Sequence, residues 1–380
     1  MTSIATTTPH STSAMRCLRT PRRQRAPFRP DAILLSGSAD DCIARENTAS
    51  SPAGSPEKCS PRSVRIAAWM LTRVLIAADV DKTLLDLLED DGRFDVDYHP
   101  CRDEAELAEK IAGASILVSR HHNRIGPAVF TKANALRVIV QGTSGLDNID
   151  SKEASARGIR IVGVPGENAN AVAELVIGHL IALTRTVPLY SSMVRSGEWI
   201  REDCSNRREL SGYRLGIVGI GRVGTRVSQL AGGFGMKVAA FDPYLTSDQI
   251  RERGASRVDT LDALLRQSDI LTLHVPLNPE TRGMIDRAAI GMLPSGAFVI
   301  NTSRGAVVDQ RELLAALSSG RLAGVAMDVF EEEPPVGIDW PPDERLILTP
   351  HIAGCSKEAK ESIARAVYQR MCDFVDAPHA

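Results

Sequence analysis

Short apolar segments of strand length alternate with helical patterns along most of the chain, and this alternation restricts the fold more than any other feature. Beyond residue 70 these segments are nearly continuous in Val, Ile, Leu and Ala, as expected of strands that helices cover on both faces. A first series comprises residues 74–78, 116–118, 137–140 and 159–162, and a second comprises LGIVGIG, KVAAFDP, ILTLHVP, AFVINTS, LAGVAMDV and LILTPH. We therefore predict an α/β protein with two doubly wound parallel-sheet domains.

The first 69 residues differ from the rest in composition. They hold ten Lys and Arg against five Asp and Glu, together with seven of the 21 prolines, and they show no helical or strand period. Such a segment cannot bury enough apolar surface to offset the entropy lost on ordering. We expect residues 1–69 to be a disordered or spurious leader. A targeting segment is the alternative, because the first 30 residues are rich in Arg and poor in acids.

The overall composition argues against several classes of protein. The 380 residues carry a net charge of -2 and only 4% aromatic residues, which disfavours a nucleic-acid partner. The most apolar stretch, residues 171–184, contains Glu174 and His179 and is shorter than the ~20 residues of a membrane span. The seven cysteines form no CxxC pair and no Cys/His cluster at metal-ligand spacing. We therefore expect a cytoplasmic protein with reduced thiols, no membrane contact and no metal site.

The strongest local motif is a glycine turn between an apolar segment and a helical pattern. Gly219 permits the tight turn, Gly221 lets the backbone approach a pyrophosphate, and Gly224 lets the helix pack closely on the strand. The N-terminus of the helix offers N–H groups and the positive end of its dipole to the phosphates. Asp242 ends the next apolar segment, where a carboxylate accepts hydrogen bonds from ribose and repels a 2′-phosphate, which favours NAD over NADP. A helix cap is the alternative role for Asp242.

Three separated polar residues each follow an apolar segment in the second half of the chain. Arg304 can bind a planar carboxylate at two points, and His351 is a natural acid/base near neutral pH. Glu333 can bind the other ring nitrogen of the histidine and fix its tautomer. Because these residues follow successive strands, we expect them on one rim of the sheet. Taken singly, each has a structural alternative: a surface salt bridge for Arg304, a solvated charge for Glu333 and a structural histidine for His351.

Seven motifs in order give the chain a family resemblance: QGTSGLDNID, ARGIRIVGVPGENANAVAE, GIVGIGRVGTRV, LHVPLNPETRGMI, INTSRGAVVD, GVAMDVFEEEPP and LTPHIAG. From about Arg73 to Val375 the chain resembles the D-isomer-specific 2-hydroxyacid dehydrogenases, closest to the D-3-phosphoglycerate dehydrogenase branch. The resemblance implies a Rossmann NAD-binding domain (residues 169–352) inserted into a discontinuous flavodoxin-like substrate domain (residues 70–168, with a returning helix at 353–380). It also implies a homodimer packed through the helix from Ala169, and a short form without a C-terminal regulatory domain.

The resemblance also assigns site residues. It implies that Arg304 binds the substrate carboxylate and keto oxygen, that Glu333 pairs with His351, and that His351 is the acid/base. Further residues implied to contact the cofactor, besides Gly219, Gly221, Gly224 and Asp242, are Arg222, Val223, Val275, Thr302, Ser303, Asp328 and Gly354. Thr143, Ser144 and Gly145 are implied to hold the substrate carboxylate through their N–H groups. Arg120 matches an arginine that contacts a substrate phosphate, with a surface role as the alternative. Its neighbours His121, His122 and Asn123 depart from the small residues usual there.

The function implied is an NAD-dependent oxidoreductase that interconverts a small D-2-hydroxy acid and its 2-keto acid, of the phosphoglycerate, glycerate/hydroxypyruvate or glyoxylate type. Hydride transfer would use the histidine as acid/base. The alternative is an NADH-binding interaction protein, similar to the transcriptional corepressors that share this fold. The first reading requires turnover of a 2-keto acid with NADH, and the second does not.

Overall fold

The computed structural model describes residues 71–201 and 207–377, all of which lie in one compact unit, Ile66–Ala380. The leader predicted at residues 1–69 lies outside the described residues. Within them the chain forms two sheets, and every strand pairing in both sheets is parallel. The predicted α/β class with two doubly wound parallel sheets is confirmed.

The first sheet has five strands in the order β2-β1-β3-β4-β5. They are β1 (Thr72–Ile76), β2 (Phe94–Tyr98), β3 (Ile116–Ser119), β4 (Val138–Gln141) and β5 (Arg160–Gly163). The connecting helices are α1 (Lys82–Asp91), α2 (Glu104–Lys110), α3 (Pro127–Lys132) and α4 (Ser151–Ala156). This strand order is the flavodoxin-like one, in which ligands bind where the order reverses, at the carboxyl ends of β1 and β3.

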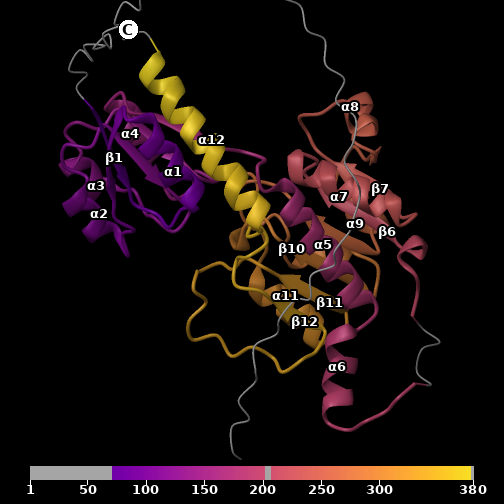
Figure 1. Ribbon diagram of the computed structural model, residues 1–380. Coiled ribbons are helices and arrows are strands. Elements are labelled where there is room, and N and C mark those ends of the chain that lie inside the picture. Colours follow the sequence, from indigo (N-terminus) through magenta and orange to yellow (C-terminus); the bar gives the residue numbers. More distant parts are fainter. Residues whose placement is uncertain (1–70, 202–206, 378–380) are drawn as a thin grey trace, which may run out of the picture. The chain divides into compact units, whose positions relative to one another are not determined.

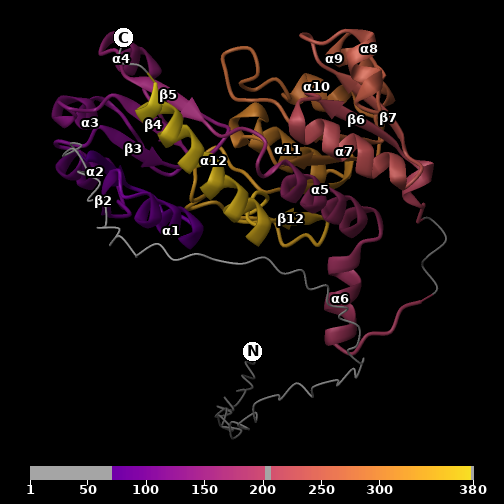
Figure 2. The ribbon, with the colours of Figure 1, turned by 45° about the horizontal axis from the view of Figure 1, so that its top comes forward.

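The last helix, α12 (Lys357–Asp376), packs on the first sheet, although the second sheet precedes it in the sequence. It contacts α1 and β4, and Figures 1 and 2 show it beside α1. Its buried residues Val367 and Met371 share one hydrophobic core with Val74 and Ile76 of β1. The first domain is thus built from two separate parts of the chain. The exact boundaries at residues 168 and 352 stay predictions.

The second sheet has seven strands in the order β12-β11-β10-β9-β6-β7-β8. They are β6 (Arg214–Val218), β7 (Lys237–Phe241), β8 (Ser256–Arg257), β9 (Ile270–Leu273), β10 (Ala297–Asn301), β11 (Leu322–Met327) and β12 (Leu346–Leu348). Helices and 3-10 turns accompany them: α5 (Ala169–Thr184), α6 (Val187–Arg195), η1 (Leu210–Gly212), α7 (Arg222–Gly233), α8 (Ser247–Glu252), α9 (Leu261–Gln267), α10 (Arg287–Met292), η2 (Gly305–Val307) and α11 (Gln310–Ser318). The order is that of a dinucleotide-binding sheet with one extra strand, and it reverses between β6 and β9.

Acidic side chains fix where several helices begin. Asp81, Asp103, Asp150, Asp286 and Asp309 precede α1, α2, α4, α10 and α11, and each accepts a backbone N–H of the first turn. These caps satisfy donors that a helix N-terminus otherwise leaves unpaired. They hold the loops at the strand ends, where the predicted site residues lie.

Three details differ from the sequence-based expectation. Strands β2 and β8 were not predicted, and β1 begins at Thr72 and not at residue 74. The long helical pattern after Ala169 is two helices, α5 and α6, bent by 62° at the break. Thr186 lies at the break with a φ of 50°, and a proline stands in the first turn of α6. No single helix in the described ranges is long and apolar enough to span a membrane.

Candidate active site

The glycine turn joins the end of β6 to the start of α7. Gly219 has a φ of +83°, and a Cβ there would lie 2.7 Å from Val275 Cγ1 and 2.9 Å from the carbonyl oxygen of His274. A Cβ on Gly224 would meet the carbonyl oxygen of Gly219, so the helix can approach the turn only because both positions lack side chains. Around Gly221 the space is open, and no side chain caps the helix at this end. The N-terminal N–H groups of α7 therefore face room for a phosphate.

Asp242 follows β7 beside this turn. One of its carboxylate oxygens accepts the N–H of Ile220 at 3.1 Å, and the other accepts the N–H of Tyr244 at 3.1 Å. The carboxylate therefore stabilises the glycine turn as well as carrying a negative charge next to it. Since an ionised carboxylate has about four acceptor positions, it can still accept hydrogen bonds from a ligand hydroxyl.

A cavity of about 440 Å³ extends from the N-terminus of α7 across the strand ends of the second sheet. It brings together most of the predicted cofactor residues: Arg222, Val223, Val275, Thr302, Ser303, Asp328 and Gly354. Thr302 Oγ1 is buried there without a hydrogen-bond partner among the described residues, so it is free to bind a ligand. Ser144, Gly145, Arg304 and His351 line the same cavity. A polar donor without a partner, an open glycine turn and an uncapped helix end together fit a dinucleotide.

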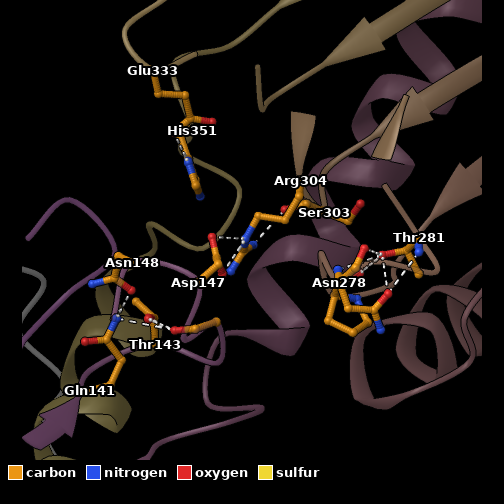
Figure 3. Close-up of polar contacts among 12 residues, drawn as sticks. Gln141, Thr143, Asp147, Asn148, Asn278, Thr281, Ser303, Arg304, Glu333 and His351 are labelled. Atoms are coloured by element: carbon orange, nitrogen blue, oxygen red, sulfur yellow. Dashed lines mark hydrogen bonds and ion pairs between the residues drawn. The ribbon is translucent and has the colours of Figure 1, made fainter. Parts of the chain in front are cut away.

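His351 and Glu333 form a close pair (Figure 3). His351 Nδ1 lies 2.6 Å from Glu333 Oε2, and the N–H of Phe330 donates to Glu333 Oε1 at 3.1 Å. Burial raises the pKa of the Glu333 carboxyl, but the hydrogen bond and charge of His351, together with the Phe330 N–H, outweigh burial and hold it below its ordinary value of 4.5. Glu333 is therefore ionised at neutral pH. With Nδ1 directed at the carboxylate, Nε2 is the nitrogen available for proton transfer.

Asp328 shapes the backbone that carries His351. Its carboxylate is fully buried and accepts Thr349 Oγ1 at 2.6 Å, the Ile352 N–H at 2.9 Å and the Ala353 N–H at 2.8 Å. Its carbonyl oxygen accepts the N–H of His351, whose φ is 53°. A non-glycine residue holds such a φ only where its surroundings fix it. Asp328 thus lines the cavity and also positions the histidine, a second role that the sequence alone did not indicate.

Arg304 reaches across to the loop after β4 (Figure 3). Its Nε lies 3.2 Å from both carboxylate oxygens of Asp147, and its Nη1 donates to the carbonyl of Ser303 at 2.7 Å. The buried Asn301 holds the Arg304 carbonyl through a hydrogen bond of 2.9 Å. The guanidinium lies so close to Gly145 that a Cβ there would collide with it. Asp147, although part of the motif QGTSGLDNID, was not among the predicted site residues.

A smaller chamber of about 80 Å³ adjoins the cavity and is lined by the predicted substrate residues. These are Arg120, Thr143, Ser144 and Gly145, which meet Arg304 and His351 there. Arg120 Nε is buried without a hydrogen-bond partner within residues 71–201 and 207–377, so a donor is available at this wall. Gly354, which was predicted to contact the cofactor, also lines the chamber, together with four residues that were not predicted: His121, Asn168, Cys355 and Ile363. Asn168 packs against Gly354, where a Cβ would approach its amide to 2.5 Å.

The described residues contain no group of three or more His, Cys, Asp and Glu side chains that could hold a metal ion.

Residues 177–353 match the family model of the D-isomer specific 2-hydroxyacid dehydrogenase, NAD binding domain. The chain is 37% identical over 274 residues to the glyoxylate reductase of Thermococcus litoralis, covering 70% of this chain and 82% of that one. The chain therefore belongs to the D-isomer specific 2-hydroxyacid dehydrogenase family, as its motifs predicted.

Other relatives carry related names. The chain is 34% identical over 301 residues to the D-3-phosphoglycerate dehydrogenase of Methanocaldococcus jannaschii, covering 79% of this chain and 57% of that one. It spans about half the length of the corresponding enzyme of Bacillus subtilis, 51%. Among solved structures, D-lactate dehydrogenase from Aquifex aeolicus, complexed with NAD and lactic acid, aligns with a TM-score of 0.73 at 25% identity. That alignment covers 80% of this chain and 95% of the other.

Replacing Asp242 with alanine is expected to shift cofactor use from NADH towards NADPH. The change removes a negative charge, and hydrogen bonds to charged groups contribute about 1.5–3 kcal/mol. We expect the ratio of kcat/KM for NADH over NADPH to fall by roughly 10- to 100-fold. Asp242→Asn is the matched control for shape, because it removes the charge and keeps an acceptor for the turn. A wild-type protein that already prefers NADPH would contradict this role of Asp242.

Proposed function

We propose that this protein is an NAD-dependent oxidoreductase that interconverts a small D-2-hydroxy acid and its 2-keto acid. The observation that carries the proposal is the chamber of about 80 Å³, where Arg304 and the Glu333-supported His351 face the same small space. A cation for a carboxylate and an acid/base for a hydroxyl proton are the two groups that such a reaction needs from the protein. The adjoining cavity of about 440 Å³ has room for the nicotinamide end of the cofactor.

The side chains divide the chemistry between them. When bound, NADH supplies the hydride for C2 of the keto acid. Arg304 holds the substrate carboxylate and the carbonyl oxygen, with the backbone N–H groups of Ser144 and Gly145 opposite. Protonated His351 donates its Nε2 proton to the oxygen that becomes the hydroxyl, and in the reverse direction neutral His351 accepts that proton. Glu333 holds the ring and balances the charge of the imidazolium.

The lining of the chamber favours a short substrate with a polar group. Thr143 and Arg120 stand at the wall beside the carboxylate-binding loop, and the Arg120 Nε is a buried donor without a partner among the described residues. A phosphate or hydroxyl on C3 would satisfy that donor. Two relatives, a D-3-phosphoglycerate dehydrogenase and a glyoxylate reductase, are named for acids of the same class.

A panel of 2-keto acids tests the proposal. Hydroxypyruvate, glyoxylate, phosphohydroxypyruvate and pyruvate are assayed with NADH and with NADPH, and we expect turnover with NADH on at least one of the first three. The competing function, an NADH-binding interaction protein, predicts cofactor binding without turnover of any of them. The intact His351–Glu333 pair favours the enzyme, because cofactor binding alone gives that pair no role.

We further propose that two copies of the chain associate through α6 and the segment after it. Val187, Val194, Trp199 and Ile200 are exposed large apolar residues along this stretch, with Trp199 81% exposed. Exposed apolar residues close together are typical of an interface. The molar mass in solution, measured by light scattering, tests the dimer, and a monomeric mass would contradict it.

A cytoplasmic location remains part of the proposal, and the free cysteines Cys101, Cys355 and Cys372 fit a reducing compartment. Localisation of the tagged full chain by cell fractionation tests it.

Replacing Glu333 with glutamine is expected to lower kcat/KM for reduction and for oxidation. The Glu333 carboxylate lies 2.6 Å from His351 Nδ1, and its pKa lies below the ordinary value of 4.5, so this charged partner is present at neutral pH and is lost only as pH falls through the lowered pKa. Glutamine keeps the shape of the side chain but removes its charge, so the ring is held less firmly in the orientation and tautomer that leave Nε2 available. The measurement is kcat/KM in both directions at neutral pH for both proteins. Equal values would contradict this role of Glu333 and turn attention to Glu331 or Glu332.

A further inference from the structure

A third cavity lies on the other side of the catalytic pair. It has a volume of about 620 Å³, and His351 and Glu333 form part of its wall. Most of the remaining wall is apolar, and the residues concerned are Phe330, Pro334, Pro335, Trp340, Leu348 and Pro350. The rings of Phe330 and Trp340 meet edge to face at 5.6 Å. The pocket is much larger than the 80 Å³ chamber at Arg304, and its lining is less polar.

Two histidines are shared by the wall of the small chamber and the wall of the apolar pocket, His121 and His351. Their rings are stacked, with centroids 4.4 Å apart and planes inclined by 23°. Stacked rings at this separation leave no space for another group between them. Together the rings of His121 and His351 therefore form a wall between the small chamber and the apolar pocket.

The charge state of His121 is compatible with its stacking on His351. Burial, the largest cause, and the positive charges of His351, His122 and Arg120 lower the pKa of His121 to about 4, with Glu333 opposing. At neutral pH the ring is uncharged, so it lies against His351 without repelling the imidazolium form of that residue. The sequence has two consecutive histidines here, and only the first one stacks on His351.

We propose that His121 sets the upper size limit of the substrate by closing the catalytic chamber off from the apolar pocket. This inference rests on the proposed function, and it adds which substrates are excluded. With His121 in place the chamber accepts 2-keto acids with a short substituent. Without its ring the chamber and the pocket become continuous, and a bulky apolar substituent can enter the pocket that Phe330 and Trp340 line.

The test compares wild type with His121→Ala and His122→Ala, using NADH with glyoxylate and with phenylpyruvate. His122 is the matched control, because it lines the apolar pocket but not the chamber and meets His121 edge to face at 5.5 Å. We expect His121→Ala to raise the ratio of kcat/KM for phenylpyruvate over glyoxylate at least tenfold. Filling or emptying an apolar pocket by a few carbons changes discrimination by roughly this amount or more. We expect His122→Ala to change the ratio less than threefold.

A third variant separates the partition from a general effect on His351. His121→Phe keeps a flat ring on the catalytic histidine and keeps the wall closed, so it should retain the wild-type ratio. An unchanged ratio in His121→Ala, or an equal change in His122→Ala, would overturn the proposal. So would a ratio in His121→Phe as high as in His121→Ala.

Binding of phenylpyruvate is measured beside turnover, so that this proposal and the proposed function can fail separately. Trp340 lines the apolar pocket and reports on its occupancy by fluorescence, with Trp340→Phe identifying its signal. In the presence of NAD⁺, which cannot reduce the keto acid, we expect the Kd for phenylpyruvate to fall at least tenfold in His121→Ala and not in His122→Ala. Absence of turnover in wild type with every 2-keto acid would contradict the proposed function alone, and the Kd values would still decide the role of His121.

Discussion

Replacing His351 with alanine is expected to lower kcat for both reduction and oxidation by about 10²- to 10⁴-fold, the usual contribution of a positioned acid/base. The same residue donates the proton in one direction and accepts it in the other, so both directions lose the same group. NADH affinity should stay within about threefold, because the glycine turn and α7 do not depend on the histidine side chain. Steady-state rates in both directions and a fluorescence titration with NADH are the measurements.

The control for His351→Ala is His122→Ala, which removes a neighbouring imidazole that does not line the Arg304 chamber. Its kcat should remain close to wild type for a short substrate. A large loss of NADH affinity in His351→Ala, or a residual kcat within tenfold of wild type, would contradict the acid/base role.

Replacing Arg304 with lysine is expected to lower kcat/KM by roughly 100-fold or more, equivalent to ~3 kcal/mol at ~1.4 kcal/mol per decade. Lysine keeps the charge but loses the planar pair of donors that matches a carboxylate. In the structure the donors of the guanidinium bind Asp147 and the Ser303 carbonyl, and the absence of a side chain at Gly145 leaves room for it. The measurement is kcat/KM for the best 2-keto acid of the panel.

Asp147→Asn is the companion variant for Arg304→Lys. It removes the ion pair with Arg304 but keeps the arginine itself. The variant therefore shows how much activity depends on the orientation of the guanidinium, separately from its contact with the substrate. We expect Asp147→Asn to lower kcat/KM less than Arg304→Lys does. A loss below tenfold in Arg304→Lys would contradict substrate binding by Arg304 and would leave it only a structural ion pair with Asp147.

Most of the fold could be predicted because a parallel sheet covered on both faces leaves a strong signal in the sequence. Strands β3, β4, β9 and β10 are buried at every position, and each is apolar at all positions but one. Strand β2, with the sequence FDVDY, lies at an edge of its sheet and is only partly buried. Its alternating aspartates interrupt the apolar run by which the other strands were predicted. Strand β8 has two residues, too few for any period. Both strands that were not predicted lie at a sheet edge, where residues are less buried than in the centre of the sheet.

The helical region after Ala169 shows another limit of sequence reasoning. Its apolar pattern continues past Thr184, but the backbone turns at Thr186, and the proline of the VPL segment begins a new helix. A proline in the first helical turn is compatible with a start as well as with an interruption. The sequence therefore indicated correctly that this region is helical, but it did not show that the second helix runs in a different direction from the first.

The predicted site residues come together because the carboxyl ends of parallel strands share one edge of a sheet. The glycine turn follows β6, Arg304 follows β10, and His351 follows β12, so strand order alone places them near one another. Contacts between the two sheets have no such signal. The pairing of Arg304 with Asp147 and the stacking of His121 on His351 depend on how loops 157 and 230 residues apart in sequence meet. The chemical roles assigned to these residues remain predictions for the experiments above.

The central claim is that the protein transfers a hydride to C2 of a 2-keto acid with His351 as proton donor. The most direct measurement uses NADH deuterated at C4 with a 2-keto acid of the panel, followed by chiral separation and mass spectrometry of the product. We predict one deuterium at C2 of the D-2-hydroxy acid in wild type, and nearly none in His351→Ala at equal NADH occupancy. NADH binding without deuterium in any hydroxy acid would contradict the claim and favour an NADH-binding interaction protein.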